Sequence, residues 1–162
     1  DGIGLGSCYE AGGKIAIAAE HPGIMGSIIG GACNSSPGLI DIGGPAVEGY
    51  YGSTAAWIEG NPDPRMVKFL KKYKQRSPGG KAPPYGGPRS YDNIYILKKI
   101  MEEEGITNKS GDLAKDREKI RKGWEKLKDY NGICGATTMD KNGDGVGGVK
   151  TLVVENGKMV SR

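Results

Sequence analysis

Residues 3–30 read IGLGSCYEAGGKIAIAAEHPGIMGSIIG, and this stretch decides the fold. The apolar run Ile3–Ser7 predicts a strand, Glu10–Glu20 predicts a helix that His21-Pro-Gly ends, and Ile24–Gly30 predicts a second strand. Short apolar runs that alternate with helical segments are typical of βαβ units and a parallel sheet. The first 30 residues therefore predict an α/β fold.

The alternation of short elements continues until the chain changes character near residue 60. We expect a short helix over Pro37–Gly43 and a strand over Gly49–Thr54. From Asn61 onward, charged amphipathic helices follow, separated by a loop at 77–88 that is rich in proline and glycine.

The C-terminal part is predicted to contain two further helices and a closing hairpin. The helix that begins near Ser90 carries apolar residues around much of its circumference, which favours burial on several sides. Another helix, over about 116–130, carries an ordinary apolar stripe. A β-rich run over 149–155 followed by Asn156-Gly157 predicts a hairpin, because this dipeptide favours a two-residue turn.

The net charge of +4 conceals an uneven distribution. Residues 1–60 contain one basic side chain and six acids, whereas the remaining 102 contain 22 basic and 13 acidic side chains. The change of sign favours two lobes. Because the basic residues are interleaved with acids on predicted polar helix faces, we expect solvated faces and no nucleic-acid partner.

The apolar pattern of the chain predicts no membrane-spanning segment, and its opening does not resemble a signal peptide. No apolar stretch approaches the roughly 20 residues that cross a bilayer, so we expect a soluble product. The opening Asp1-Gly-Ile-Gly resembles a strand already under way and lacks the charged and apolar regions of a signal peptide. We therefore expect an upstream segment that is not part of these 162 residues.

The motifs that would indicate an enzyme or a zinc site are incomplete. Cys8, Cys33 and Cys134 show no zinc-ligand spacing, and their odd number leaves at least one thiol free or paired outside the chain. The single histidine, His21, leaves no base beside a candidate nucleophile. We expect no catalytic residue, no metal ligand and no cofactor.

One segment matches part of a calcium-binding loop. Asp140–Gly145 has the first residues of an EF-hand loop, but Thr151 stands where the bidentate Glu is needed, and the flanks favour strands over helices. We expect a tight turn here, and a calcium-binding structural domain is a third hypothesis for the function.

Residues that follow the predicted strands are the candidate binding residues, because ligands of parallel α/β sheets bind outside the carboxyl ends of the strands. They are Ser7, Cys8 and Tyr9 after the first strand, and Ala32, Cys33 and Asn34 after the second. Tyr9 is the strongest candidate, since its ring can form the wall of a pocket while its hydroxyl orients a polar group.

A series of six segments extends over nearly the whole chain. They are Ile28–Gly31 (IIGG), Leu39–Tyr50 (LIDIGGPAVEGY), Phe69–Tyr73 (FLKKY), Ser90–Tyr95 (SYDNIY), Tyr130–Asp144 (YNGICGATTMDKNGD) and Glu155–Val160 (ENGKMV). In their order and spacing, these segments resemble the type I periplasmic solute-binding proteins of branched-chain amino acid (Leu/Ile/Val) ABC transporters.

The resemblance implies two α/β lobes that close on a small ligand, with this chain as the C-terminal portion. It places residues 1–57 in the C-terminal lobe, 62–130 in a helical excursion that belongs to the N-terminal lobe, and 131–162 in the return strands and hairpin of the C-terminal lobe. The first half of the family fold, which holds a ligand carboxylate, is absent. The N-terminal half of the same protein is therefore an expected partner.

The resemblance also implies roles for particular residues. The aromatic wall of the family falls on Tyr9, and the loop that contains Tyr85 lines the hinge side. The acid that binds an amino acid's ammonium falls near Ala32 or Cys33, and neither is acidic. Since a buried ammonium needs a partner, either another residue supplies the charge or the ligand is not an α-amino acid. Expected ligands are an amino acid, an aliphatic or aromatic acid, or an amide.

The function that the resemblance implies is solute uptake without turnover. We expect the binding component of an ABC transporter that delivers its ligand to the permease subunits of the membrane. The expected location is periplasmic or extracellular, with a lipoprotein anchor as one alternative. The alternative function is a cytosolic ligand-sensing regulator of the same fold, which an upstream export signal would distinguish from an uptake protein.

Overall fold

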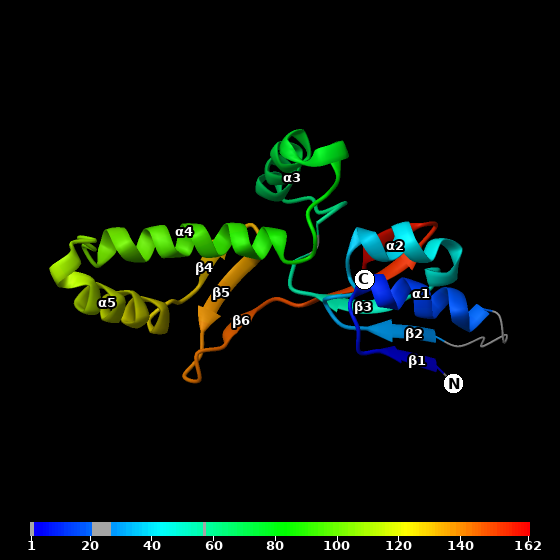
Figure 1. Cartoon of the computed structure of the whole chain (residues 1–162), viewed down its shortest axis with the longest axis horizontal. Coiled ribbons are helices and arrows are strands. Elements are labelled where there is room, and N and C mark those ends of the chain that lie inside the picture. The colour runs from blue at the N-terminus through cyan, green and yellow to red at the C-terminus, as the bar shows by residue number, and fades with distance from the viewer. Residues whose placement is uncertain (1, 21–26, 57) are drawn as a thin grey trace. The chain divides into compact units, whose positions relative to one another are not determined.

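The computed structural model describes residues 2–20, 27–56 and 58–162, which divide into two compact units (Figure 1). Unit 1 comprises Asp1–Pro88 and Val149–Arg162, and unit 2 comprises Arg89–Gly148. Within the described ranges, no helix combines the length and the apolar character needed to cross a membrane.

Unit 1 is built on a five-stranded sheet in the order β1-β2-β3-β7-β8. The strands β1 (Gly2–Leu5), β2 (Ser27–Gly30) and β3 (Tyr51–Thr54) are parallel. The strands β7 (Lys150–Glu155) and β8 (Lys158–Ser161) add an antiparallel edge. The predicted parallel α/β sheet is therefore confirmed, and the predicted closing hairpin forms its edge.

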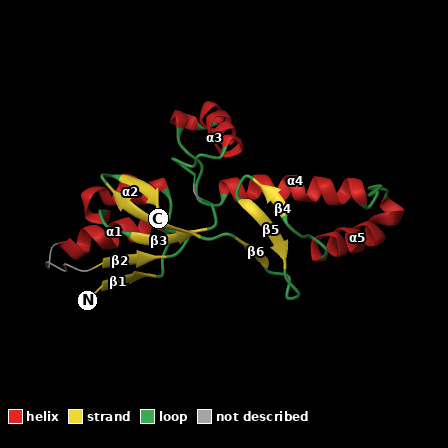
Figure 2. Ribbon diagram, turned by 180° about the vertical axis from the view of Figure 1, so that it is seen from behind, coloured by secondary structure: helices red, strands yellow, loops and turns green. Residues whose placement is uncertain are grey.

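Two helices cover one face of this sheet (Figures 1 and 2). The helix α1 (Tyr9–Glu20) lies between β1 and β2 in the chain, and α2 (Pro37–Gly43) lies between β2 and β3, both close to their predicted bounds. The core between sheet and helices consists of Leu5, Ala16, Ile28, Leu39, Val47, Tyr50 and Val154. The opposite face of β2 and β3 is open, since the paired residues Ile29 and Tyr51 are 57% and 45% exposed.

Several predicted strand bounds differ from the observed ones, and the third strand begins at Tyr51, two residues after its predicted start at Gly49. The first strand ends at Leu5, two residues before the predicted end at Ser7. The predicted second strand and the predicted helix stop at His21 both fall partly on residues 21–26, which lie outside the described residues. The described part of that strand begins at Ser27.

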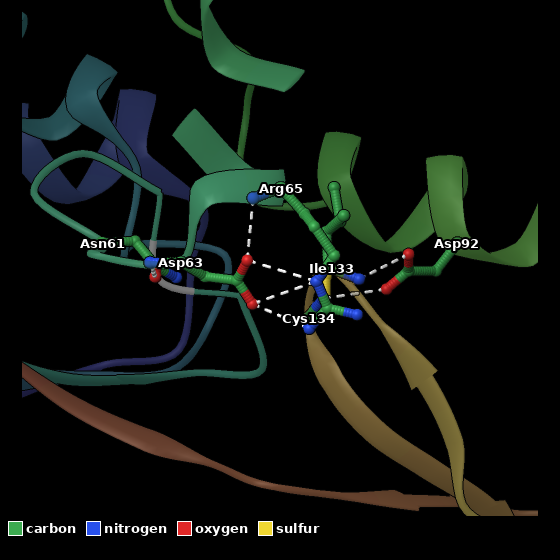
Figure 3. Close-up of polar contacts among 6 residues, drawn as sticks. All are labelled: Asn61, Asp63, Arg65, Asp92, Ile133 and Cys134. Carbon is green, nitrogen blue, oxygen red and sulfur yellow. Dashed lines mark hydrogen bonds and ion pairs between the residues drawn. The ribbon is translucent and has the colours of Figure 1, made fainter. Parts of the chain in front are cut away.

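A local cap fixes the start of α3 (Pro64–Arg76) in unit 1 (Figure 3). The Asp63 carboxylate accepts a hydrogen bond from the Arg65 backbone N–H at 2.8 Å and pairs with the Arg65 guanidinium at 2.7 Å. The Asn61 Oδ1 in turn accepts from the Asp63 N–H at 2.9 Å. A cap of this kind with proline in the first turn is a strong start signal, and it confirms the helix start predicted at Asn61-Pro-Asp-Pro.

Unit 2 combines two helices with a small antiparallel sheet. The helices are α4 (Gly87–Glu103), whose first two residues belong to unit 1, and α5 (Leu113–Glu125). The sheet has the order β4-β5-β6, formed by β4 (Tyr130–Gly132), β5 (Gly135–Met139) and β6 (Gly145–Gly147). The core of unit 2 consists of the buried residues Ile96, Ile100 and Leu127.

The prediction that the helix from Ser90 is buried on several sides is wrong. In α4, Ile96 and Ile100 are buried, but Ile94 is 66% exposed and Tyr95 is exposed as well. The reason is that the residues packed against α4 come from α5, the segment after it and the strands β4 and β5, and they cover only one stripe of the helix.

The strands of residues 131–162 divide between two sheets. The strands β4–β6 form their own sheet in unit 2, whereas β7 and β8 join the sheet of unit 1. The lobe boundaries expected at 57, 62 and 130–131 refer to a whole two-lobed protein and stay a prediction.

Candidate functional site

The candidate site lies where the parallel strands of unit 1 end. Because β1 and β2 pair in parallel register, with Leu5 opposite Gly30, the residues that follow them emerge at the same edge of the sheet. The structure brings together the two predicted groups, Ser7–Tyr9 and 32–34. The Asn34 Nδ2 donates a hydrogen bond to the Ser7 carbonyl at 2.5 Å.

A disulfide bond joins the same two groups. Cys8 and Cys33 are bonded, with their Cα atoms 4.8 Å apart, and Cys134 is the free cysteine. The sequence left the pairing open. A signal was present, because each partner lies three residues after a strand end, Leu5 or Gly30, and those two ends are opposite each other in the sheet.

Tyr9 opens helix α1 and packs against the start of α2. A Cβ atom at Gly38 would lie 2.5 Å from the Tyr9 ring, so only glycine permits this contact. Hydrogen bonding to the neighbouring Glu10 carboxylate raises the pKa of the Tyr9 hydroxyl. The ring is thereby held on one side by α2 while its hydroxyl is engaged with a carboxylate.

Tyr9 lines an open hollow of about 690 Å³ in unit 1. Charged side chains of both signs share it: Glu10, Asp41 and Glu59, with Lys74 and Lys81. Glu59 and Lys74 form an ion pair at 2.8 Å. The sequence interpretation found no acid near Ala32 or Cys33. It overlooked Glu10, which directly follows Tyr9 in the sequence, and it missed Asp41, which the packing of α1 beside α2 places with Tyr9. The hollow offers groups for an ammonium and for a carboxylate.

The remaining predicted site residues differ in exposure. Ala32 and Cys33 are half-buried at the surface of the loop. Asn34 is 0% exposed and lies beneath them. Tyr85, in the turn before α4, is 36% exposed and is not among the described residues that line the hollow. Its role on the hinge side stays a prediction.

Two polar atoms at the strand ends lack a partner. In the described part of the chain, the Ser7 Oγ and the Asn34 Oδ1 are the buried side-chain oxygens and nitrogens without a hydrogen bond. Buried polar groups nearly always have a hydrogen-bond partner, so two unpartnered atoms at the same edge of the sheet are unusual. Their free hydrogen-bonding capacity lies at the strand ends.

The segment that matched part of a calcium-binding loop is a tight turn. Asp140 accepts hydrogen bonds from the backbone N–H groups of Asn142 and Asp144 at 2.8 and 2.9 Å, and strands β5 and β6 flank the turn. The predicted turn is confirmed. Among the residues that the structure describes, no group of three His, Cys, Asp or Glu side chains is arranged to hold a metal ion.

A buried carboxylate organises unit 2 (Figure 3). Asp92, in the Ser90–Tyr95 segment, accepts hydrogen bonds at 2.9 Å from the backbone N–H groups of Ile133 and Cys134. A Cβ atom at Gly132 would lie 2.3 Å from an Asp92 oxygen, so glycine is required beside it. Asp92 therefore joins two of the six segments found in the sequence, Ser90–Tyr95 and Tyr130–Asp144.

Solved structures of solute-binding proteins resemble the chain over its whole length. A leucine-binding protein LivK from Thermotoga maritima is 30% identical, with a TM-score of 0.81 over 99% of this chain and 43% of that chain. LivJ from Streptococcus pneumoniae, solved in complex with isoleucine, is 20% identical, with a TM-score of 0.77 over 100% of this chain and 45% of that chain. The predicted resemblance to branched-chain amino acid binding proteins is confirmed.

A solute-binding protein of an ABC transporter from Rhodopseudomonas palustris, solved with benzoate, is 15% identical, with a TM-score of 0.79 over 99% of this chain and 42% of that chain. This likeness and that to LivJ concern the fold alone. The chain thus spans less than half the length of each of these three proteins. The type I periplasmic binding protein fold predicted from the sequence is confirmed for the portion present.

No curated protein sequence matches the chain. The family model described as "Periplasmic binding protein" matches residues 11–158. Since that match covers most of the 162 residues, the chain belongs to the periplasmic binding protein family.

Proposed function

We propose that the chain is part of the solute-binding component of an ABC uptake transporter. It binds a small amino acid or carboxylate-type ligand between two lobes and delivers it to the permease. The observation that carries this proposal is the meeting of Ser7–Tyr9 and 32–34 at one sheet edge, beside a hollow that holds both carboxylates and ammonium groups. Binding without turnover is the proposed activity.

The charges of the hollow support a ligand that carries a carboxylate. Lys81 offers an ammonium for it, whereas Glu10 and Asp41 offer partners for a ligand ammonium. Two proteins of related fold were solved with isoleucine and with benzoate. Both ligands carry a carboxylate, but only isoleucine carries an ammonium group. These charges favour an amino acid or an aliphatic or aromatic acid among the expected ligand classes, and an amide, which lacks the carboxylate, is the third class to be tested.

Two exposed apolar surfaces support a partner from the same protein. Ile29 and Tyr51 lie open on the sheet of unit 1, and Ile94 and Tyr95 lie open on α4 of unit 2. Exposed apolar side chains gathered on one face mark contact surfaces. The proposed partner is the N-terminal half of the family fold, which supplies the rest of the ligand cleft.

The disulfide supports a location outside the cytosol. Structural disulfides persist in oxidising compartments and are rare where thiol reductants are abundant. Cys8–Cys33 therefore favours a periplasmic or extracellular protein, with or without a lipid anchor, over a cytosolic regulator of the same fold.

A thermal-shift screen of the full-length protein tests the proposal, with amino acids, short-chain acids, aromatic acids and amides as ligands. A hit is expected to raise Tm in proportion to the logarithm of its concentration and to be recovered chemically unchanged by mass spectrometry. Tyr9→Ala is expected to remove the shift, whereas Lys14→Ala, exposed on the same helix, is expected to retain it. Chemical conversion of the ligand, or an equal shift in both variants, would contradict the proposal.

A further inference from the structure

The segment that follows β2 is tied to the strands on both of its sides. Toward β1, Cys33 is bonded to Cys8 and the Asn34 Nδ2 donates to the Ser7 carbonyl at 2.5 Å. Toward β3, the Ser35 Oγ donates to the Ser53 carbonyl at 2.9 Å. We call the two links toward β1, the Cys8–Cys33 disulfide and the Asn34 amide, the strand-end clamp.

Asn34 is enclosed by positions that lack side chains. A Cβ atom at Gly12 in α1 would lie 2.2 Å from the Asn34 Oδ1, and one at Gly30 would lie 3.2 Å from the Asn34 Cβ. The amide is fully buried and spans 27 residues of sequence to reach Ser7. This enclosure restricts the side chain to one position, so the loop that carries Ala32 and Cys33 is anchored at Asn34.

The clamp lies at the ligand side of the sheet and outside its hydrophobic core. Cys8 is exposed and Cys33 is half-buried, and their direct neighbours in the chain are the candidate contact residues Tyr9 and Ala32. The backbone hydrogen bonds of the second loop form short-range turns, as from the Asn34 N–H to the Gly31 carbonyl and from the Ser35 N–H to the Ala32 carbonyl. Such turns shape a loop but do not set its distance from another loop.

We propose that the strand-end clamp is a positioning device for the ligand site. It holds Ser7–Tyr9 and the 31–36 loop in one mutual arrangement before the ligand arrives, so that binding does not have to order them. This inference rests on the proposed function for its use, but the order of the two loops can be measured without any ligand.

The first test compares full-length wild type with Cys8→Ser/Cys33→Ser by amide hydrogen exchange. Peptides that cover 7–9 and 31–36 are expected to exchange about tenfold faster in the double variant, whereas peptides from the middle of α1 keep their rate. Cys134→Ser, which removes the third thiol, is the matched control and is expected to match wild type. Unchanged exchange in the two loops, or a uniform rise that includes α1, would overturn the proposal.

A second variant decides the case if the double variant does not fold. Asn34→Ala removes the bond to the Ser7 carbonyl and keeps the disulfide, and it is expected to raise exchange in the same two loops. Dithiothreitol added to Cys134→Ser breaks the Cys8–Cys33 bond and is expected to have the effect of the double variant on the same two loops. Loops that stay protected under both treatments would overturn the clamp.

The binding experiment measures the Kd of L-leucine and of sodium benzoate for the same proteins, under conditions in which each protein is folded. For a probe that binds wild type, the double variant is expected to raise Kd about tenfold, mainly through a faster dissociation rate. An unchanged Kd would refute the positioning role. If neither probe binds wild type, these ligands are excluded from the proposed function, and the exchange experiment alone still decides whether the clamp orders the loops.

Discussion

The Asp92 carboxylate is 2% exposed and accepts a 2.9 Å hydrogen bond from the backbone N–H of Ile133, 41 residues along the chain. Its second oxygen accepts from the next N–H, that of Cys134, at the same distance. One side chain of α4 thus satisfies two N–H groups at the turn between β4 and β5. This contact joins the helix to the sheet of unit 2.

Replacement of Asp92 is therefore expected to destabilise the protein. Asp92→Ala leaves two buried N–H groups without acceptors and should lower the free energy of unfolding by about 2–4 kcal/mol. Asp92→Asn keeps one acceptor oxygen and should cost less. Urea unfolding followed by circular dichroism measures both. Glu102→Gln, at an exposed ion pair on the same helix, should change stability by less than about 0.5 kcal/mol; a larger loss there than at Asp92 would refute the assigned role.

Gly132 tests the same contact from the other side. A Cβ atom at this position would lie 2.3 and 2.7 Å from the two Asp92 oxygens, so Gly132→Ala must displace the carboxylate or the strand. We expect a loss of about 1–3 kcal/mol, and the loss in Gly132→Ala/Asp92→Ala should be smaller than the sum of the two single losses. Gly111→Ala, where no atom lies within 4 Å of the new Cβ, is the control. Additive losses would show that the two residues act separately.

The sequence predicted the elements of unit 1 well because its signals are local. The glycine-flanked apolar runs, the Asp63-Pro64 helix start and the Asn156-Gly157 turn each depend on a few neighbouring residues. Burial of α4 was predicted wrongly because a helix wheel shows which residues are apolar and does not show how many layers pack against them.

The candidate site was predictable only in part. The rule that ligands bind at strand ends selected Ser7–Tyr9 and 32–34, and the structure brings them together. The disulfide was missed because the predicted strand end at Ser7 was two residues too late, which hid the equal offset of Cys8 and Cys33 from their strands. Of the acids of the hollow, Glu10 directly follows Tyr9 in the sequence and could have been found there. Asp41 and Glu59 are placed beside Tyr9 by tertiary packing, which no local pattern specifies.

Calcium is expected to have no effect on stability. The Asp140 carboxylate is occupied by the N–H groups of Asn142 and Asp144, and the strand on its far side supplies no bidentate acid. Tm should stay the same within error from zero to millimolar CaCl₂, with EDTA as the reference. A rise in Tm that disappears in Asp140→Asn but not in Asp116→Asn would show that the turn binds calcium after all.

The free cysteine is expected to be unreactive in the native protein. Burial, followed by the nearby Asp92 charge, raises the pKa of the Cys134 thiol to about 12. At pH 8 its thiolate fraction, and hence its rate of labelling by iodoacetamide, should be at least about 100-fold lower than in the unfolded chain. Because the pKa is raised on folding, the stability linked to this group is present below pH 9 and is lost as the pH rises toward 12. Cys134→Ala should therefore lose less stability than wild type over that range.

The turn of the closing hairpin requires left-handed backbone at both central residues. Asn156 has φ 53° and Gly157 has φ 66°, and the N–H groups of both donate to the Glu48 carboxylate at 2.5 and 3.1 Å. Gly157→Ala places a side chain where the left-handed conformation costs about 1–2 kcal/mol and should lower stability by that amount. Asn156→Gly should be tolerated within about 0.5 kcal/mol, because glycine adopts positive φ freely. Urea unfolding measures the stability of both variants. Lys158→Ala, at an exposed neighbour outside the turn, is the control that separates the backbone effect from the loss of a side chain. A stable Gly157→Ala together with a destabilised Asn156→Gly would contradict the assigned turn.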